Sequence, residues 1–234
     1  MKRNLLFIGM LGIISQVSFG QAVRDRQVIP VAVNLNQVLR MTITNGGNIE
    51  FVFNTIDDYK NGLSGDQGTS SSANPAASEP FYKSDFTVAS STRWKVTYGS
   101  EEATFIGTDN PANTLALDNV GFTIVNGGGH NFEGTGLAKA TTAGAELFST
   151  PTDNANTGTA LQAYPVDLIE DNDDATSANA GDATDNSFQL VWRCGTAEAF
   201  TVNPMNTVKL IDQQPSPTPD RYVTNVLFEL AIDN

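Results

Sequence analysis

The stretch YVTNVLFELAI, residues 222–232, decides the fold class, because apolar side chains recur in it at every second position. A period of two places alternate side chains on opposite faces of a β-strand. We therefore expect one long strand here. Three prolines alternate with Ser216 and Thr218 at residues 215–219, just before this stretch. This run predicts an extended connector, since proline cannot donate a ladder hydrogen bond.

The same alternation recurs through the chain in shorter pieces, and helical periodicity is scarce. Long polar loops rich in Gly, Ser, Asn, Asp and Thr separate these pieces, and short helices are expected only at residues 55–61 and 138–148. This organisation predicts an all-β protein, an antiparallel β-sandwich of Ig-like or jelly-roll type with long polar loops. The expected strands are residues 86–88, 93–98, 120–125, 166–168 and 188–194.

The first twenty residues are typical of an export signal. Lys2 and Arg3 precede an apolar run at residues 5–14, and Ser18 and Gly20 place small residues where signal peptidase reads them. The run is shorter than the roughly 20 residues needed to cross a bilayer. We therefore expect a signal peptide at 1–20, with a second cleavage position open after residue 22, and a secreted, extracellular or cell-surface protein without membrane insertion.

After the signal, residues 21–36 are expected to form an N-terminal extension that leads into a β-sandwich domain at 37–234. In this extension Ile29, Val31, Val33 and Leu35 share one face of an expected strand. Apolar alternation returns at 39–43 and at 49–53, on either side of an Asn-Gly-Gly-Asn sequence. Because Gly and Asn tolerate the positive φ angles of a tight reversal, this pattern predicts a hairpin.

Charge and cysteine content exclude several classes of protein. The formal net charge is −13, and −15 once the two basic residues of the signal are removed. Nucleic-acid binding requires clustered Lys and Arg, so it is excluded, and binding to anionic membranes is disfavoured. Cys194 is the only cysteine, so no intramolecular disulfide can form. It alternates with apolar residues of the strand at 188–194, which predicts a buried thiol.

No catalytic constellation is evident in the sequence, so we expect a protein that is not an enzyme. His130 is the only histidine and lies in a glycine-rich loop, whereas a triad needs a firmly held imidazole. One His and one Cys cannot supply a usual zinc site. Paired acids could serve a glycosidase, but the aromatic residues Trp94, Tyr98 and Trp192 lie on strand faces and are expected to be core.

The acidic loop after residue 169 contains the one metal site that we expect. Asp171, Asp173 and Asp174 place carboxylates close together, and calcium prefers six to eight oxygen ligands. The spacing differs from the EF-hand pattern, so a solvated acidic loop is the alternative. Calcium is the only cofactor that the sequence suggests.

The alternating segments at 29–35 and 222–232 together resemble those of secreted bacterial fibre subunits of the pilin type, although a cysteine pair is absent. The resemblance implies a structural subunit of an extracellular filament, whose partners are other copies of itself and whose N-terminal strand adds to the sheet of a neighbour. The same strand could instead pair within its own subunit. The alternative function is a secreted carbohydrate-binding or adhesin domain, calcium-dependent if the acidic loop binds calcium, with glycans or a host surface as partner.

Overall fold

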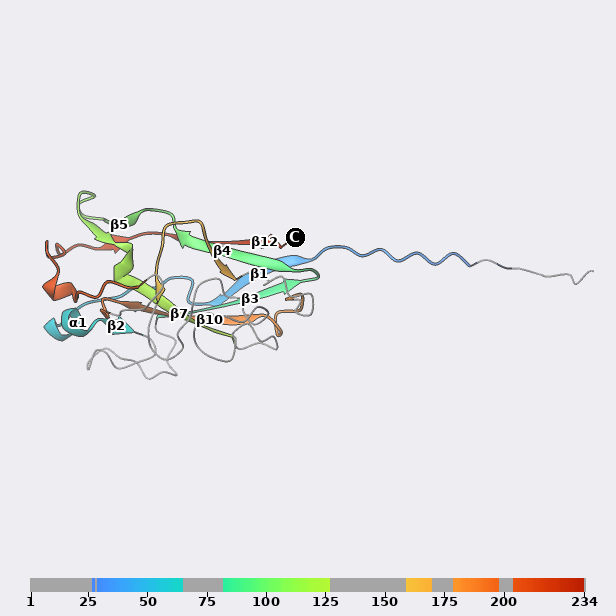
Figure 1. The fold of residues 1–234 in the computed structure, drawn as a ribbon, viewed down its shortest axis with the longest axis horizontal. Helices are drawn as coiled ribbons and strands as arrows, with labels where there is room; N and C mark the ends of the chain where they lie inside the picture. The colour runs from blue at the N-terminus through green and yellow to red at the C-terminus, as the bar shows by residue number, and fades with distance from the viewer. Residues whose placement is uncertain are drawn as a thin grey trace, which may run out of the picture. The chain divides into compact units, whose positions relative to one another are not determined.

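The structure, a computed structural model, describes residue 27 and residues 29–64, 82–126, 159–169, 179–197 and 204–233. The chain divides into two compact units, residues 1–35 and residues 36–234, and we call the second unit the β domain. All strands and helices given below belong to the β domain (Figure 1).

The larger sheet of the β domain has six strands, and all of its pairings are antiparallel. They are β1 (Leu39–Asn45), β2 (Leu63–Ser64), β3 (Lys83–Ser90), β7 (Val120–Asn126), β8 (Thr159–Ala160) and β10 (Ser187–Cys194). Their order is β1-β3-β10-β7-β8, and β2 also pairs with β10. β1 is therefore an end strand of this sheet, paired with β3.

Two smaller antiparallel sheets are also present among the described residues. One has the order β12-β4-β9, so β12 is its end strand, and the other has the order β11-β5-β6. The first contains β4 (Trp94–Ser100), β9 (Val166–Ile169) and β12 (Val226–Ile232). The second contains β5 (Thr104–Gly107), β6 (Thr114–Ala116) and β11 (Tyr222–Val223).

The core lies between the larger sheet and the β12-β4-β9 sheet, and aromatic rings join the two layers. Trp94 of β4 meets Phe188 of β10 edge-on, with ring centroids 5.9 Å apart. Tyr98 of β4 meets Phe122 of β7 at 5.2 Å and an interplanar angle of 90°. Ring quadrupoles favour this edge-to-face geometry. Two facing antiparallel sheets, with almost no helix among the described residues, confirm the predicted all-β sandwich (Figure 1).

The predicted alternation accounts for the burial of the central strands. On β4, Trp94, Val96 and Tyr98 have no exposed surface, whereas the residues between them are only half-buried. Trp192 of β10 is also buried. The prediction that Trp94, Tyr98 and Trp192 are core residues is therefore confirmed.

A buried asparagine fixes the start of β4, a feature that the sequence did not indicate. Asn179 accepts a hydrogen bond from the Trp94 backbone N–H at 3.0 Å, and its side-chain amide donates to the Trp94 carbonyl oxygen at 2.6 Å. The Trp94 indole donates to the Asn179 carbonyl oxygen at 2.6 Å. Buried polar groups need such partners. The chain after residue 169, where the sequence predicts an acidic loop, thus enters the core at Asn179.

The C-terminal stretch forms two strands, so the prediction of one strand over 222–232 is wrong. β11 pairs with β5, whereas β12 pairs with β4. Between them, the Thr224 hydroxyl lies 2.7 Å from the Ser100 hydroxyl, and the Asn225 side chain donates to Glu101 at 2.7 Å. These polar contacts hold the chain where it passes from the β5 ladder to the β4 ladder. The apolar alternation of the sequence therefore continues across a break between two strands.

The predicted hairpin between 39–43 and 49–53 is also wrong, because β1 pairs with β3. The turn does form, and Gly46 has a φ of +64°. It packs tightly on β3: a Cβ at Gly46 would lie 1.7 Å from the Lys83 carbonyl oxygen, and the Ser84 hydroxyl donates to the Gly46 carbonyl oxygen at 2.6 Å. The chain therefore turns away over β3, and 49–53 contains no strand.

The remaining predicted elements agree with the structure where it describes them. The five shorter expected strands are confirmed as parts of β3, β4, β7, β9 and β10. The helix expected at 55–61 is confirmed as α1 (Ile56–Asn61), which begins at a capping box of Thr55 and Asp58. β2, β5, β6 and β8 were missed, because runs of two to four residues carry little periodicity. The helix expected at 138–148 lies outside the described residues.

Two single-turn 3-10 helices complete the described elements. They are η1 (Leu117–Asn119) and η2 (Leu210–Asp212). No described helix has the length and apolar character needed to span a membrane.

Candidate assembly site

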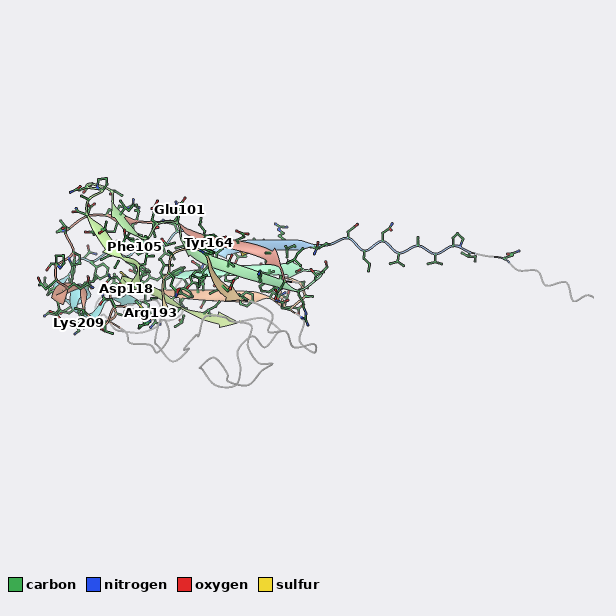
Figure 2. All side chains as sticks on the ribbon, turned by 45° about the horizontal axis from the view of Figure 1, so that its top comes forward. Glu101, Phe105, Asp118, Tyr164, Arg193 and Lys209 are labelled. Carbon is green, nitrogen blue, oxygen red and sulfur yellow. The ribbon has the colours of Figure 1, made fainter. Side chains whose placement is uncertain are left out.

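We call residues 29–35 the N-terminal segment. The apolar face that the sequence predicts for this segment is exposed to water. The exposed fractions of Ile29, Val31, Val33 and Leu35 are 83%, 83%, 76% and 91%. The segment has no assigned strand, so the strand expected there lacks a ladder partner within the described residues. In Figure 2 the side chains along this segment point alternately to its two sides. Four large apolar side chains in one row are therefore exposed.

The residues that follow the N-terminal segment are anchored to the loop between β3 and β4. Val38 donates its backbone N–H to the Ser91 hydroxyl at 2.9 Å and accepts from the Ser91 N–H at 3.0 Å. The Gln37 side chain donates to the Thr92 hydroxyl at 3.2 Å. These bonds extend the pairing of β1 with β3 by one residue. The chain thus enters the β domain at the end formed by the β3–β4 loop.

One edge of the sandwich leaves core-facing apolar residues of β1 incompletely covered. Met41 lies opposite Val88 of β3, and Ile43 lies opposite Phe86, so these pairs share the core face of the sheet. Val88 and Phe86 are 0% and 3% exposed. In contrast, Met41 is half-buried and Ile43 is 53% exposed.

The end strand of the other layer shows the same contrast. Core-facing residues of β4 have no exposed surface, but their neighbours on β12 are only half-buried. Phe228 lies opposite Tyr98, and Leu230 lies opposite Val96. The core-facing residues of β12 are Val226, Phe228, Leu230 and Ile232.

β1 and β12 lie next to one another, so the two incompletely covered rows belong to the same edge (Figure 1). We call it the β1/β12 edge. An end strand carries unpaired backbone N–H and C=O groups and can pair with an added strand. Here the backbone edge is combined with an exposed apolar row, and an alternating strand could cover both.

The described residues do not test the expected calcium site. The predicted calcium ligands Asp171, Asp173 and Asp174, and also His130, lie outside the described residues. Within the described ranges, no group of three or more His, Cys, Asp or Glu side chains is placed to hold a metal ion. Three large aromatic residues, Trp94, Tyr98 and Trp192, are buried in the core.

Asp220 is a carboxylate with several partners, and these partners give it a structural role. Its oxygens accept hydrogen bonds that tie the loop between β5 and β6 to the start of β11. The donors are the backbone N–H groups of Asp109, Asn110 and Arg221 and the side-chain amide of Asn113, at 2.7–3.2 Å. These bonds, that of Asp109 first, lower the pKa of Asp220.

Cys194 is buried in the core, as predicted. Burial raises the pKa of its thiol to about 12, so the thiol stays protonated at neutral pH. A protonated, inaccessible thiol is a poor nucleophile. Cys194 therefore acts as a small apolar core residue.

Comparison of the sequence with models of known protein families gave no match, and comparison with curated proteins gave none. The site described above consequently rests on the geometry of this chain. The sequence indicated the N-terminal segment. It did not indicate the incomplete cover of β12, because the same alternation is typical of a fully covered strand.

Proposed function

We propose that this protein is the structural subunit of an extracellular bacterial filament, in which the N-terminal segment of one copy adds as a β-strand to the next copy. The observation that carries the proposal is the pairing of two features: a segment with four apolar side chains that are 76–91% exposed, and a sandwich edge whose core-facing residues are incompletely covered. The segment can cover the exposed apolar residues of the edge, and the edge can provide the strand partner that the segment needs. Strand addition of this kind combines main-chain hydrogen bonds with burial of alternate side chains.

The physical driving force is burial of apolar surface on both partners. Full burial of a Val, Leu or Ile side chain contributes about 1.5–3 kcal/mol, and the N-terminal segment has four such side chains in one row. Ordering the segment opposes this gain. The half-buried row of the acceptor adds further area, so the two surfaces together favour the ordered state.

The charge distribution supports assembly through this segment. Residues 27–39 contain no charged side chain, whereas the chain as a whole has a formal net charge of −13. Like charges keep unassembled copies apart in solution. An uncharged, apolar segment can still approach a second copy. The expected signal at residues 1–20 would deliver the chain outside the cell, where the filament forms.

A head-to-tail contact between identical subunits produces an open polymer. Donor and acceptor are different surfaces, so the contact is heterologous and does not close on itself unless the rotation makes a ring. A filament is therefore the expected product.

The experiment compares the full chain with a variant that lacks residues 29–35, both exported from a bacterial host. Negative-stain electron microscopy and sedimentation should show filaments for the full chain and subunit-sized particles for the deletion. Circular dichroism and tryptophan fluorescence check that the deletion keeps the fold, because Trp94 and Trp192 are buried. Filaments from the folded deletion variant would refute assembly through this segment, and a full chain that never assembles would refute the filament itself.

A further inference from the structure

We infer that the acceptor is the edge of β12 that pairs with no other described strand, and that the N-terminal segment of a second copy pairs with it antiparallel, in a register that places Val33 opposite Phe228. This inference rests on the proposed function and specifies its acceptor strand. It follows from the length, the apolar pattern, the direction and the charge of the two segments.

Length and pattern match between donor and acceptor. β12 has seven residues, Val226–Ile232, and four of them form the half-buried core-facing row. The N-terminal segment also spans seven residues, and its four apolar side chains occupy every second position. A strand added to β12 must place these side chains on the core face, because a slip by one residue would turn all of them to water.

Direction follows from where the chain enters the β domain. Val38 is bonded to Ser91 at the β3–β4 loop, and β12 ends near this loop, since Asp233 donates its N–H to the Arg93 carbonyl oxygen at 3.2 Å. In an end-to-end polymer, the segment leaving this end of one copy reaches the next copy at the opposite end, where β12 begins with Val226 opposite Ser100. The segment then runs from Leu35 beside Val226 toward Ile29.

This direction makes the added strand antiparallel to β12 and parallel to β1. Antiparallel pairing is slightly more stable per residue than parallel pairing, so β12 is favoured over β1 as the ladder partner. Met41 and Ile43 of β1 then pack against the added side chains from the other layer. The opposed core-facing pairs are Leu35–Val226, Val33–Phe228, Val31–Leu230 and Ile29–Ile232.

The other end of the same sheet is a poorer acceptor. β9 has only four residues, and its pairing with β4 contains a register shift. Leu168 and Ile169 of β9 have no exposed surface. An added strand on β9 would therefore cover almost no further apolar side chain, so the gain that drives assembly is absent there.

Charge also fits the pairing with β12. The one charged residue of β12 is Glu229, which faces away from the core and accepts a hydrogen bond from the Tyr164 hydroxyl at 2.5 Å. In the inferred register, Ala32 lies opposite Glu229, and Asn34 lies opposite Leu227. Every core-facing contact is then apolar, and no carboxylate is buried.

Disulfide cross-linking of the outward-facing pair Asn34 and Leu227 tests the register. Directly opposite residues of antiparallel strands have Cβ atoms about 4.5–5.5 Å apart, close to the spacing that a disulfide needs. Full chains carry Cys194→Ala, which removes the native thiol, together with Asn34→Cys and Leu227→Cys. Under oxidation, denaturing gels without reductant should show a ladder of covalent oligomers that reductant collapses to one band. Mixing the two single-cysteine chains should give dimers that contain one of each.

The matched control moves the second cysteine to the other end of the sheet. Asp167 of β9 is exposed, like Leu227 of β12. Asn34→Cys with Asp167→Cys should give no ladder. Filaments that cross-link through Asp167 and not through Leu227 would overturn the β12 assignment and leave the filament proposal standing. A cross-link within single chains would show that the segment pairs with its own subunit, which overturns both.

A second measurement does not depend on the cysteine variants. A synthetic peptide of residues 27–37 is added to the deletion variant that lacks residues 29–35. If β12 accepts the segment, the peptide should raise the melting temperature of this variant by several degrees, and a peptide with Val33→Asp should not. Equal effects of the two peptides would contradict the inferred core-facing contact.

Discussion

Two seven-residue segments of this chain have the same alternating pattern but different structural environments. β12 lies in a ladder with β4, and its core-facing residues are half-buried. The N-terminal segment has no ladder with any part of the chain that the structure describes, and its apolar residues are 76–91% exposed. The difference teaches that alternation specifies a strand and the face it buries, whereas the partner strand depends on what the rest of the fold leaves unpaired. On the proposed function, each segment is the missing partner of the other.

The largest effect is expected from a charge on the core-facing side of the N-terminal segment. Val33→Asp would bury an unpaired carboxylate in the assembled state, which costs several kcal/mol. Asn34→Asp adds the same charge on the outward face. Sedimentation should show loss of filaments for Val33→Asp and retention for Asn34→Asp. Equal assembly of the two variants would mean that this face is not buried in the filament.

Shortening one leucine in each environment distinguishes a covered strand from an incompletely covered one. Leu190 of β10 is 1% exposed, so Leu190→Ala should lower the free energy of unfolding by about 3 kcal/mol. Leu230 of β12 is half-buried, and Leu230→Ala should lower it by about 1 kcal/mol in the unassembled subunit. Urea unfolding of chains that lack 29–35 gives both values.

In the filament, the mild destabilising effect of Leu230→Ala should become larger. With the segment in place, Leu230 is fully covered, so this variant should depolymerise at lower urea concentration than the unsubstituted filament. An unchanged depolymerisation midpoint would show that Leu230 gains no cover on assembly.

Thiol labelling compares the same edge with the interior. A cysteine at position 43, where Ile43 is 53% exposed, should react quickly with a maleimide in the chain that lacks 29–35. In filaments the rate should fall at least about tenfold, because the added strand restricts access. Cys194 should remain unreactive in both until the protein unfolds, since it is buried and its pKa is raised to about 12. Equally fast labelling at position 43 in filaments and subunits would contradict cover of the β1/β12 edge.

A smaller, pH-dependent effect is expected at the start of the C-terminal stretch. Hydrogen bonds lower the pKa of Asp220 below the value of an unfolded chain, about 3.9. Its stabilisation is thus fully present above that value and is lost as the pH falls through the lower folded value. Asp220→Asn should reduce the melting temperature at pH 7, and the difference from the native chain should shrink as the pH falls below the unfolded value of about 3.9. Glu102→Gln, which neutralises an exposed carboxylate, is the control for the loss of one charge, and it should leave the melting temperature at pH 7 nearly unchanged.

Period-two alternation predicted the class of fold and the central strands, because side-chain direction in a strand is a local property. It could not predict the break at Thr224 and Asn225, where contacts with Ser100 and Glu101 decide the path of the chain. The hairpin failed for a similar reason, since Gly46 fits closely on Lys83 of β3, which is distant in sequence. Of the assembly site, the sequence indicated Ile29, Val31, Val33 and Leu35. The acceptor depends on cover, which only the packed sheets reveal.

A cryo-electron microscopy map of the filament would show how neighbouring copies are joined. We expect a four-stranded sheet in which residues 29–35 of one copy lie antiparallel to β12 of the next, with Val33 opposite Phe228 and the order continuing through β4 to β9. A map in which residues 29–35 pair within their own subunit, or in which subunits join without an added strand on β12, would contradict this arrangement.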